Sequence, residues 1–252
     1  MKYWPYPKLF AHRGGGSLAP ENTLAAIKRG RAMGYIAVEF DVKLSKDNVA
    51  VLMHDSTLER TTNGVGAVKD KGGDELQLLD AGAWHSPEFK GERIPRFTDI
   101  AHFLLVHGVM ANVEIKPCEG REAETGRLVA ELCSELWRDH AVKPLISSFS
   151  FTALQSAVLA APELPYGLLI KTPAEDCLIK LKEIGCVSLH CNHMEIDAAI
   201  VRLFQDNGYK ILSYTVNEPE RARELVSWGI DGMFTDNLAV MAREFPGYLS
   251  PG

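Results

Sequence analysis

The sequence predicts an α/β protein, a (β/α)₈ TIM barrel with a small insertion after an early hairpin. Short β-like runs alternate with helical patterns along most of the chain. Such alternation implies parallel strands that are joined by helical crossovers. Eight candidate strands favour a closed barrel over an open sheet, and 252 residues is an ordinary length for one barrel domain spanning the whole chain.

The candidate strands are short apolar runs, and the candidate helices between them have recognisable ends. The strands are expected at residues 9–12, 37–42, 111–116, 145–149, 166–170, 187–191, 211–216 and 232–235. Asn22 is expected to cap a helix that closes at Gly34. Asp197 and Pro219 are expected to open two later helices, each followed by a glycine that can end it.

One region breaks the alternation soon after the second strand. Asp47 and Asn48 suit a tight hairpin turn between two β-like runs. Folding the chain about this turn places His54 across from Asp41, or from Glu39 if the turn slips by one residue. Either register leaves the imidazole on the face that carries the carboxylates.

The hairpin leads into a segment, at about residues 56–95, that is rich in glycine, threonine and charge. Its helical periodicity is weak, so it is expected to be a small insertion beside the barrel mouth rather than a second domain. Trp84, Phe89 and Phe97 are expected to form the insertion's own small core, with covering of the active site as the alternative.

Composition excludes several classes of protein. The formal net charge of −6 argues against a nucleic-acid partner and against a basic membrane anchor. The N-terminal residues 1–7 contain two prolines and no apolar run, so no secretory signal is expected. No apolar stretch is long enough to span a bilayer, and the five cysteines lack the spacing of a disulfide scaffold. A cytoplasmic protein is therefore expected.

Three carboxylates are expected to meet at the barrel mouth. Glu39 and Asp41 are two residues apart on one strand and so point to the same face, and Glu114 lies on the next parallel strand. Three carboxylates in one place repel one another unless a cation neutralises them. All-oxygen ligation suits a hard divalent ion, Mg²⁺ or Ca²⁺, with Mn²⁺ as a further candidate.

Basic residues and histidines follow the same strands. The first strand ends in His12, Arg13 and three glycines, which allow backbone N–H groups to approach an anion. Arg13 and Lys116 suit phosphate oxygens. His12 and His54 can supply a proton donor and a proton acceptor near neutral pH. This combination of groups indicates metal-assisted phosphoryl transfer.

These motifs resemble those of the glycerophosphodiester phosphodiesterases. The matching strings, in order, are AHRGGGSLAPENTLAA, VEFDV, HDSTLERTTNG, NVEIKP, LISSFS, CVSLHCNH, ILSYTVN and GIDGMFTDN, so the resemblance covers nearly the whole chain. The opening MKYWPYPKLFAHRGGG and the phrase APELPYGLL are similar to the cytoplasmic bacterial members of the family.

The resemblance implies roles that agree with those argued from the residues. It implies a metal held by Glu39, Asp41 and Glu114, acid/base catalysis by His12 and His54, and phosphate binding by Arg13 and Lys116. Tyr214 stands where the family often has Trp, and it is expected to form an aromatic wall against the glycerol.

The implied reaction is hydrolysis of soluble glycerophosphodiesters to sn-glycerol 3-phosphate and an alcohol. Which histidine is the acid stays open, as does the nucleophile, which is either water or a glycerol hydroxyl. Choline, ethanolamine, glycerol and inositol head groups all remain candidates. The rival hypotheses are a barrel that cleaves membrane phospholipids, which would need an exposed apolar loop, and a non-catalytic binding protein on the same fold.

The segment Cys186 to His193 suggests zinc, because it holds two cysteines and two histidines. Its spacing fits no standard zinc motif, and His190 and Cys191 would face opposite sides of a strand. His190 is instead expected to line the substrate pocket at the end of its strand.

Overall fold

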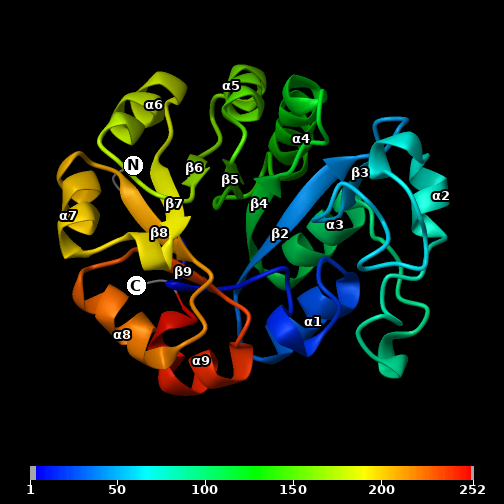
Figure 1. The fold of residues 1–252 in the computed structure, drawn as a ribbon, viewed down its shortest axis with the longest axis horizontal. Coiled ribbons are helices and arrows are strands. Elements are labelled where there is room, and N and C mark those ends of the chain that lie inside the picture. Colours follow the sequence, from blue (N-terminus) through cyan, green and yellow to red (C-terminus); the bar gives the residue numbers. More distant parts are fainter. Residues whose placement is uncertain (1–3, 251–252) are drawn as a thin grey trace.

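A closed (β/α)₈ barrel is the architecture of the computed structural model, which describes residues 4–250 (Figure 1). The strand order in the sheet is β1-β9-β8-β7-β6-β5-β4-β2-β3, and an additional pairing between β1 and β2 closes the ring. Neighbouring strands are parallel except for β3, which runs antiparallel to β2. The predicted fold class is confirmed.

The strands begin and end close to the predicted residues. They are β1 (Leu9–Ala11), β2 (Ala37–Leu44), β3 (Ala50–Leu52), β4 (Met110–Ile115), β5 (Leu145–Ser148), β6 (Tyr166–Ile170), β7 (Ser188–Asn192), β8 (Lys210–Tyr214) and β9 (Gly232–Thr235). The α-helices are α1 (Leu24–Ala32), α2 (Gly73–Gln77), α3 (Phe97–His107), α4 (Glu122–Leu136), α5 (Phe151–Ala160), α6 (Asp176–Ile184), α7 (Ala198–Asp206), α8 (Pro219–Ser227) and α9 (Leu238–Glu244). The 3₁₀ turns are η1 (Gly16–Leu18), η2 (Val68–Asp70), η3 (Pro87–Phe89), η4 (His193–Glu195) and η5 (Pro246–Tyr248).

Alternation along β2 explains how charged groups come to lie inside the barrel. All eight residues of this strand are buried. Val38, Phe40 and the other even-numbered residues pack in the apolar layer under the helices, where Phe40 meets Phe97 of α3. Glu39 and Asp41 therefore point to the barrel interior. The interior also holds an apolar group that includes Phe10 and Phe234.

Two predicted helix starts are confirmed and one is wrong. Asp197 caps α7 by accepting a hydrogen bond from the Ile200 N–H at 2.9 Å, and Pro219 is the first residue of α8. The cap of α1 is Thr23 rather than Asn22, because the Thr23 hydroxyl accepts the hydrogen bond from the Ala26 N–H. The Asn22 side chain is engaged elsewhere, in the site described below.

The chain between β3 and α3 lies beside the barrel mouth and carries α2, η2 and η3 (Figure 1). Its apolar cluster is built mainly from aliphatic residues such as Leu58, Val68 and Ile94. The predicted aromatic core is wrong. Phe97 starts α3 and packs in the barrel core, whereas Trp84 remains 42% exposed.

No helix within residues 4–250 has the length and apolar character needed to cross a membrane. Residues 1–3, at the start of the segment in which no secretory signal is expected, lie outside the described residues.

Candidate active site

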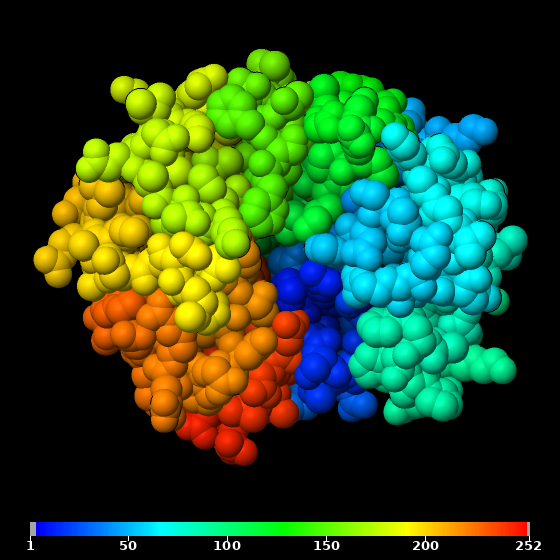
Figure 2. All heavy atoms as spheres, in the orientation of Figure 1, coloured from blue at the N-terminus to red at the C-terminus, as the bar shows by residue number. Residues whose placement is uncertain are grey.

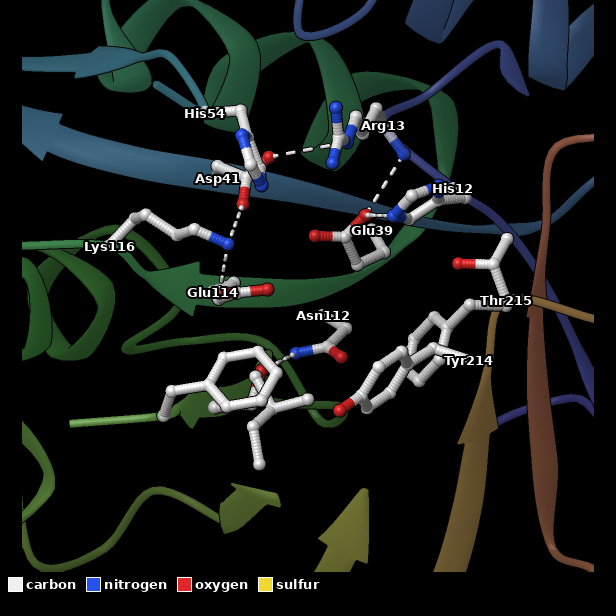
Figure 3. A pocket seen from close by; sticks show the side chains of 14 residues that line it. His12, Arg13, Glu39, Asp41, His54, Asn112, Glu114, Lys116, Tyr214 and Thr215 are labelled. Carbon is white, nitrogen blue, oxygen red and sulfur yellow. Dashed lines mark hydrogen bonds and ion pairs between the residues drawn. The ribbon is translucent and has the colours of Figure 1, made fainter. Parts of the chain in front are cut away.

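A cavity of about 210 Å³ opens at the C-terminal ends of the barrel strands, where active sites of this fold lie. The space-filling view shows the centre of this face hollowed beside the blue N-terminal residues (Figure 2). Eight of the nine predicted site residues line the cavity (Figure 3). They are His12, Arg13, Glu39, Asp41, His54, Glu114, Lys116 and Tyr214.

The three predicted carboxylates are brought together. Glu39, Asp41 and Glu114 each offer an oxygen within 4.8 Å of the others, and all three are buried. Burial, with the charge of Asp41 added, raises the pKa of Glu39 to about 7 and that of Glu114 to about 8. The three groups therefore resist ionising together unless a cation joins them.

The donor atoms fit a hard divalent ion. Glu39 Oε2 accepts a hydrogen bond from the Arg13 N–H at 2.9 Å, whereas the buried Glu39 Oε1 finds no hydrogen-bond partner among residues 4–250. A buried carboxylate oxygen without a partner is costly, and a metal ion would satisfy it. Because all candidate donors are carboxylate oxygens, the group suits Mg²⁺, Ca²⁺ or Mn²⁺ rather than zinc.

Two cations surround Asp41. Lys116 Nζ lies 3.3 Å from Asp41 Oδ1 and 2.7 Å from Glu114 Oε1, and Arg13 Nε lies 3.8 Å from Asp41 Oδ2. Burial alone would raise the pKa of Asp41, but the charges of Lys116 and Arg13 outweigh it and hold that pKa at about 2. Two positive side chains, Arg13 and Lys116, therefore line the cavity beside the ionised carboxylate of Asp41, where they could bind a phosphate.

A tight turn after β1 carries His12 and Arg13. Arg13 and Gly14 both have positive φ angles, of 50° and 86°, and the Gly16 N–H donates to the His12 carbonyl at 2.9 Å. The turn rests on α1 so closely that a Cβ on Gly30 would lie 2.1 Å from the Gly14 carbonyl oxygen. Glycine at position 30 is thus what lets this turn pack against the helix.

His12 is oriented by a carboxylate from β9. Its Nδ1 lies 2.7 Å from Asp236 Oδ1, and its Nε2 lies 3.7 Å from Glu39 Oε2. Burial lowers the pKa of His12, but the hydrogen bond that its Nδ1–H donates to Asp236 and the charge of Glu39 outweigh burial and raise it. The contact also fixes the ring so that Nε2 faces the carboxylates.

His54 also lies in the cavity, but the predicted hairpin register is wrong. Val42 pairs with Leu52, and the Met53 N–H donates to the Asp41 carbonyl at 3.1 Å, so Met53 rather than His54 lies beside Asp41. The strand β3 ends at Leu52, and His54 reaches the cavity from the loop that follows.

A chain of ion pairs supports His54. Its Nδ1 lies 2.6 Å from Asp55 Oδ1, and Arg60 donates to both Asp55 and Glu21. Glu21 in turn accepts from Arg13 Nη1 at 2.6 Å. Burial lowers the pKa of His54. The two histidines therefore share a pattern, in which an aspartate binds Nδ1, while their pKa values shift in opposite directions.

Sequence patterns miss several residues that support the site. Asn22 has a φ of 58° and binds Asp41 from below, and Glu21, Asp55 and Asp236 hold the catalytic-site side chains described above. The PENT string places Asn22 and Glu21 at a helix start, where a local capping role is the obvious expectation. Only the fold shows that Asn22 binds Asp41 and that Glu21 binds Arg13 instead.

The expected position of His190 is wrong. This residue is fully buried in the barrel interior, below the cavity rather than in its wall. Its Nε2 lies 3.0 Å from Ser188 Oγ, and its ring packs on Phe234 at a centroid distance of 5.5 Å. Burial lowers the pKa of His190 to about 3, as expected for a neutral core histidine.

Tyr214 forms part of an aromatic wall. Its hydroxyl donates to the Ile170 carbonyl at 2.9 Å, and its ring meets Phe149 edge-on at 5.7 Å. Lys116 Nζ lies 5.6 Å from the centroid of Phe149, which closes the cavity on that side.

Residues 12–240 match the sequence model described as "Glycerophosphoryl diester phosphodiesterase family". A glycerophosphodiester phosphodiesterase of Caldanaerobacter subterraneus is 34% identical over 233 residues, covering 91% of this chain and 93% of that protein. One from Bacillus subtilis is 29% identical over 255 residues, covering 94% of this chain and 86% of that protein.

Solved structures of phosphodiesterases are similar to this chain in both sequence and fold. A phosphodiesterase of Oleispira antarctica, solved in complex with the product sn-glycerol-3-phosphate, is 34% identical and superposes with a TM-score of 0.89. That match covers 96% of this chain and 97% of the Oleispira chain. A glycerophosphodiester phosphodiesterase of Agrobacterium tumefaciens is 28% identical, with a TM-score of 0.77 and coverage of 94% and 99%.

Proposed function

The chain belongs to the glycerophosphoryl diester phosphodiesterase family, and we propose that it hydrolyses soluble glycerophosphodiesters to sn-glycerol 3-phosphate and an alcohol by metal-dependent, two-histidine catalysis. One observation carries the proposal. Two histidines flank a buried three-carboxylate group in one cavity that also holds Arg13 and Lys116 (Figure 3).

Glu39, Asp41 and Glu114 would hold a divalent ion, Mg²⁺, Ca²⁺ or Mn²⁺. When bound, the ion would supply Lewis-acid polarisation of the phosphodiester. Arg13 and Lys116 would donate hydrogen bonds to the nonbridging phosphate oxygens and stabilise the charge that develops there. Tyr214 and Phe149 would lie against the glycerol carbons.

The opposite pKa shifts of the two histidines favour one division of the two proton transfers. His54, whose pKa is lowered, would start neutral and take the proton of the attacking hydroxyl, which belongs to water or to the glycerol itself. Attack by the glycerol hydroxyl would first close a cyclic phosphate, which a water molecule would then open to glycerol 3-phosphate. His12, whose pKa is raised, would start protonated and donate its proton to the alcohol oxygen as the bond from phosphorus to that oxygen breaks. Asp55 and Asp236 would keep the two rings in orientation.

The five cysteines support a cytoplasmic location, because all are buried and none forms a disulfide among the described residues. The absence of any spanning helix within residues 4–250 is compatible with a soluble substrate.

The test is release of glycerol 3-phosphate from glycerophosphocholine with Mg²⁺, Mn²⁺ or Ca²⁺, and with EDTA. Metal-dependent release is expected from the unaltered protein, with large losses in His12→Ala and His54→Ala. His102→Ala is the matched control, because His102 is an exposed residue of α3. No release from any glycerophosphodiester with any of these ions would refute the proposal.

A further inference from the structure

A second cavity of about 520 Å³ adjoins the catalytic one. The two share His12, Arg13 and Thr215, so they meet at the place where the proposed proton donor lies. Trp84 and His85 of the insertion form one side of the second cavity, and Asp236 belongs to its lining as well. We call this second cavity the outer groove.

The two cavities differ in the groups they offer. Lys116 and the three buried carboxylates line the catalytic cavity and not the outer groove. The phosphate and the glycerol arm of a diester therefore match the catalytic cavity. The departing alcohol, which is the second arm of the diester, would take its proton from His12. The outer groove adjoins the catalytic cavity at His12 and can receive this alcohol.

Trp84 is held in place before any ligand arrives. Asp80 Oδ1 accepts hydrogen bonds from the N–H groups of Gly82 and Ala83, at 2.9 and 2.8 Å. The Trp84 Nε1–H donates to the Ala81 carbonyl at 2.9 Å. An aromatic ring fixed in this way loses little conformational entropy on binding, although 42% of the residue is exposed.

His85 joins this turn to the barrel. Its ring packs edge-on against Trp84 at 5.5 Å and against Phe89 at 5.4 Å. Its Nε2 lies 3.2 Å from the Ser17 carbonyl oxygen, which belongs to the turn after His12. The position of Trp84 relative to His12 is thus set by direct contacts between the insertion and the first loop of the barrel.

The groove also holds two carboxylates, Asp236 and Glu21. The Asp236 side chain is 38% exposed, and its pKa is lowered: burial alone would raise it, but the hydrogen bond from His12 outweighs burial. Glu21 is the second carboxylate of the lining, and Arg13 and Arg60 bind it. An exposed indole and a carboxylate in one groove form a combination that attracts an ammonium group.

We propose that the outer groove is the subsite for the departing alcohol and that it favours amino alcohols, whose ammonium group would lie on the Trp84 ring near Asp236. This inference rests on the proposed diester hydrolysis. It makes Trp84 a residue that determines which head group is preferred, and it leaves the phosphate and glycerol contacts to the catalytic cavity.

The test compares two diesters with the same glycerol phosphate arm, glycerophosphocholine, whose alcohol is a cation, and glycerophosphoglycerol, whose alcohol is neutral. In Trp84→Ala, the ratio of kcat/KM for the choline diester to that for the glycerol diester is expected to fall roughly 3- to 30-fold. Trp84→Phe should retain most of the ratio, because it keeps an aromatic face. Leu78→Ala, at an insertion residue that is 72% exposed, is the matched control and should leave the ratio unchanged.

Thermal melting of each variant separates misfolding from altered preference, and Trp84→Phe keeps the test decisive if Trp84→Ala does not fold. Equal falls for both diesters, or no fall, in folded Trp84→Ala would overturn the subsite while hydrolysis itself stands. A protein that cleaves neither diester with any metal would overturn the proposed function and this inference with it.

Discussion

Asn22 and Asp41 exchange a reciprocal pair of hydrogen bonds at the base of the catalytic cavity. Asn22 Nδ2 donates to Asp41 Oδ2 at 2.8 Å, and the Asp41 N–H donates to Asn22 Oδ1 at 3.0 Å. One amide thus fixes both the backbone and the carboxylate of a candidate metal ligand. Residues that orient a metal-ligating side chain in this way commonly affect the affinity of the site for its metal.

Replacing Asn22 by glycine should weaken metal binding about 10- to 100-fold. Glycine keeps the positive φ of 58° accessible while it removes both hydrogen bonds. The measurement is the Mn²⁺ concentration that gives half-maximal glycerol 3-phosphate release. Asn48→Gly is the control, because Asn48 has a φ of 66° in the hairpin turn and does not line the catalytic cavity. Equal metal requirements in the two variants would contradict this role of Asn22.

Asp236→Asn should lower kcat by about 10²- to 10⁴-fold and change KM much less, because it replaces the charged acceptor of the His12 ring by a neutral amide that no longer favours the protonated imidazole. Steady-state kinetics with glycerophosphoglycerol measures the two parameters separately. That substrate lacks the ammonium group proposed to lie near Asp236. A change confined to KM would indicate that Asp236 only contacts the substrate.

Glu39→Gln should raise the melting temperature in EDTA near pH 8 while it abolishes activity. Burial and the charge of Asp41 raise the pKa of Glu39 to about 7, so its ionisation at this pH costs stability that a neutral amide avoids. Each kcal/mol recovered corresponds to about 2–4 °C in a protein of this size.

Added Mg²⁺, Mn²⁺ or Ca²⁺ should raise the melting temperature of the unaltered protein more than that of Glu39→Gln, because the ion binds only the folded site. Glu131→Gln, an exposed change on α4, is the control and should behave as the unaltered protein does. A melting temperature that no divalent ion changes would count against the three-carboxylate site.

His190 should make the protein less stable in mild acid. Burial holds its pKa at about 3, against about 6.5 in the unfolded chain. Below about pH 6.5 the unfolded chain therefore binds a proton that the folded protein does not, and stability falls by up to about 1.4 kcal/mol per pH unit until the pH approaches 3.

Urea unfolding between about pH 7.5 and 5.5 tests this, and His190→Gln should lose less stability over that interval. His102→Gln, on the exposed side of α3, should keep the slope of the unaltered protein. Identical slopes for all three proteins would show that His190 titrates normally.

The barrel and most of the cavity could be predicted from the sequence because their determinants are local and periodic. Two-residue spacing on β2 and β4 places Glu39, Asp41 and Glu114 inside, and parallel strands bring their ends together. The resemblance to known phosphodiesterases points to the same positions, although the chemical roles assigned to them remain predictions.

The hairpin register, the depth of His190 and the role of Asn22 depend on tertiary geometry that no short sequence pattern contains. The hairpin turns through residues 46–48, with Asn48 in the left-handed region, so its register differs by one residue from either predicted pairing. His190 points into the barrel interior, as alternation along β7 predicts, but its ring is fully buried below the cavity and does not line it. Asn22 looks like a helix cap until the fold brings Asp41 beside it.

The insertion has a consequence for how such enzymes can diversify. The chain between β3 and α3, which contains the insertion, supplies His54 and Trp84 and has an apolar cluster of its own. The carboxylates that are proposed to bind a metal and the basic residues come instead from the barrel. Under the proposed roles, recombination that exchanged this segment between relatives would change which alcohol is preferred and keep the barrel residues that are proposed to bind glycerol phosphate.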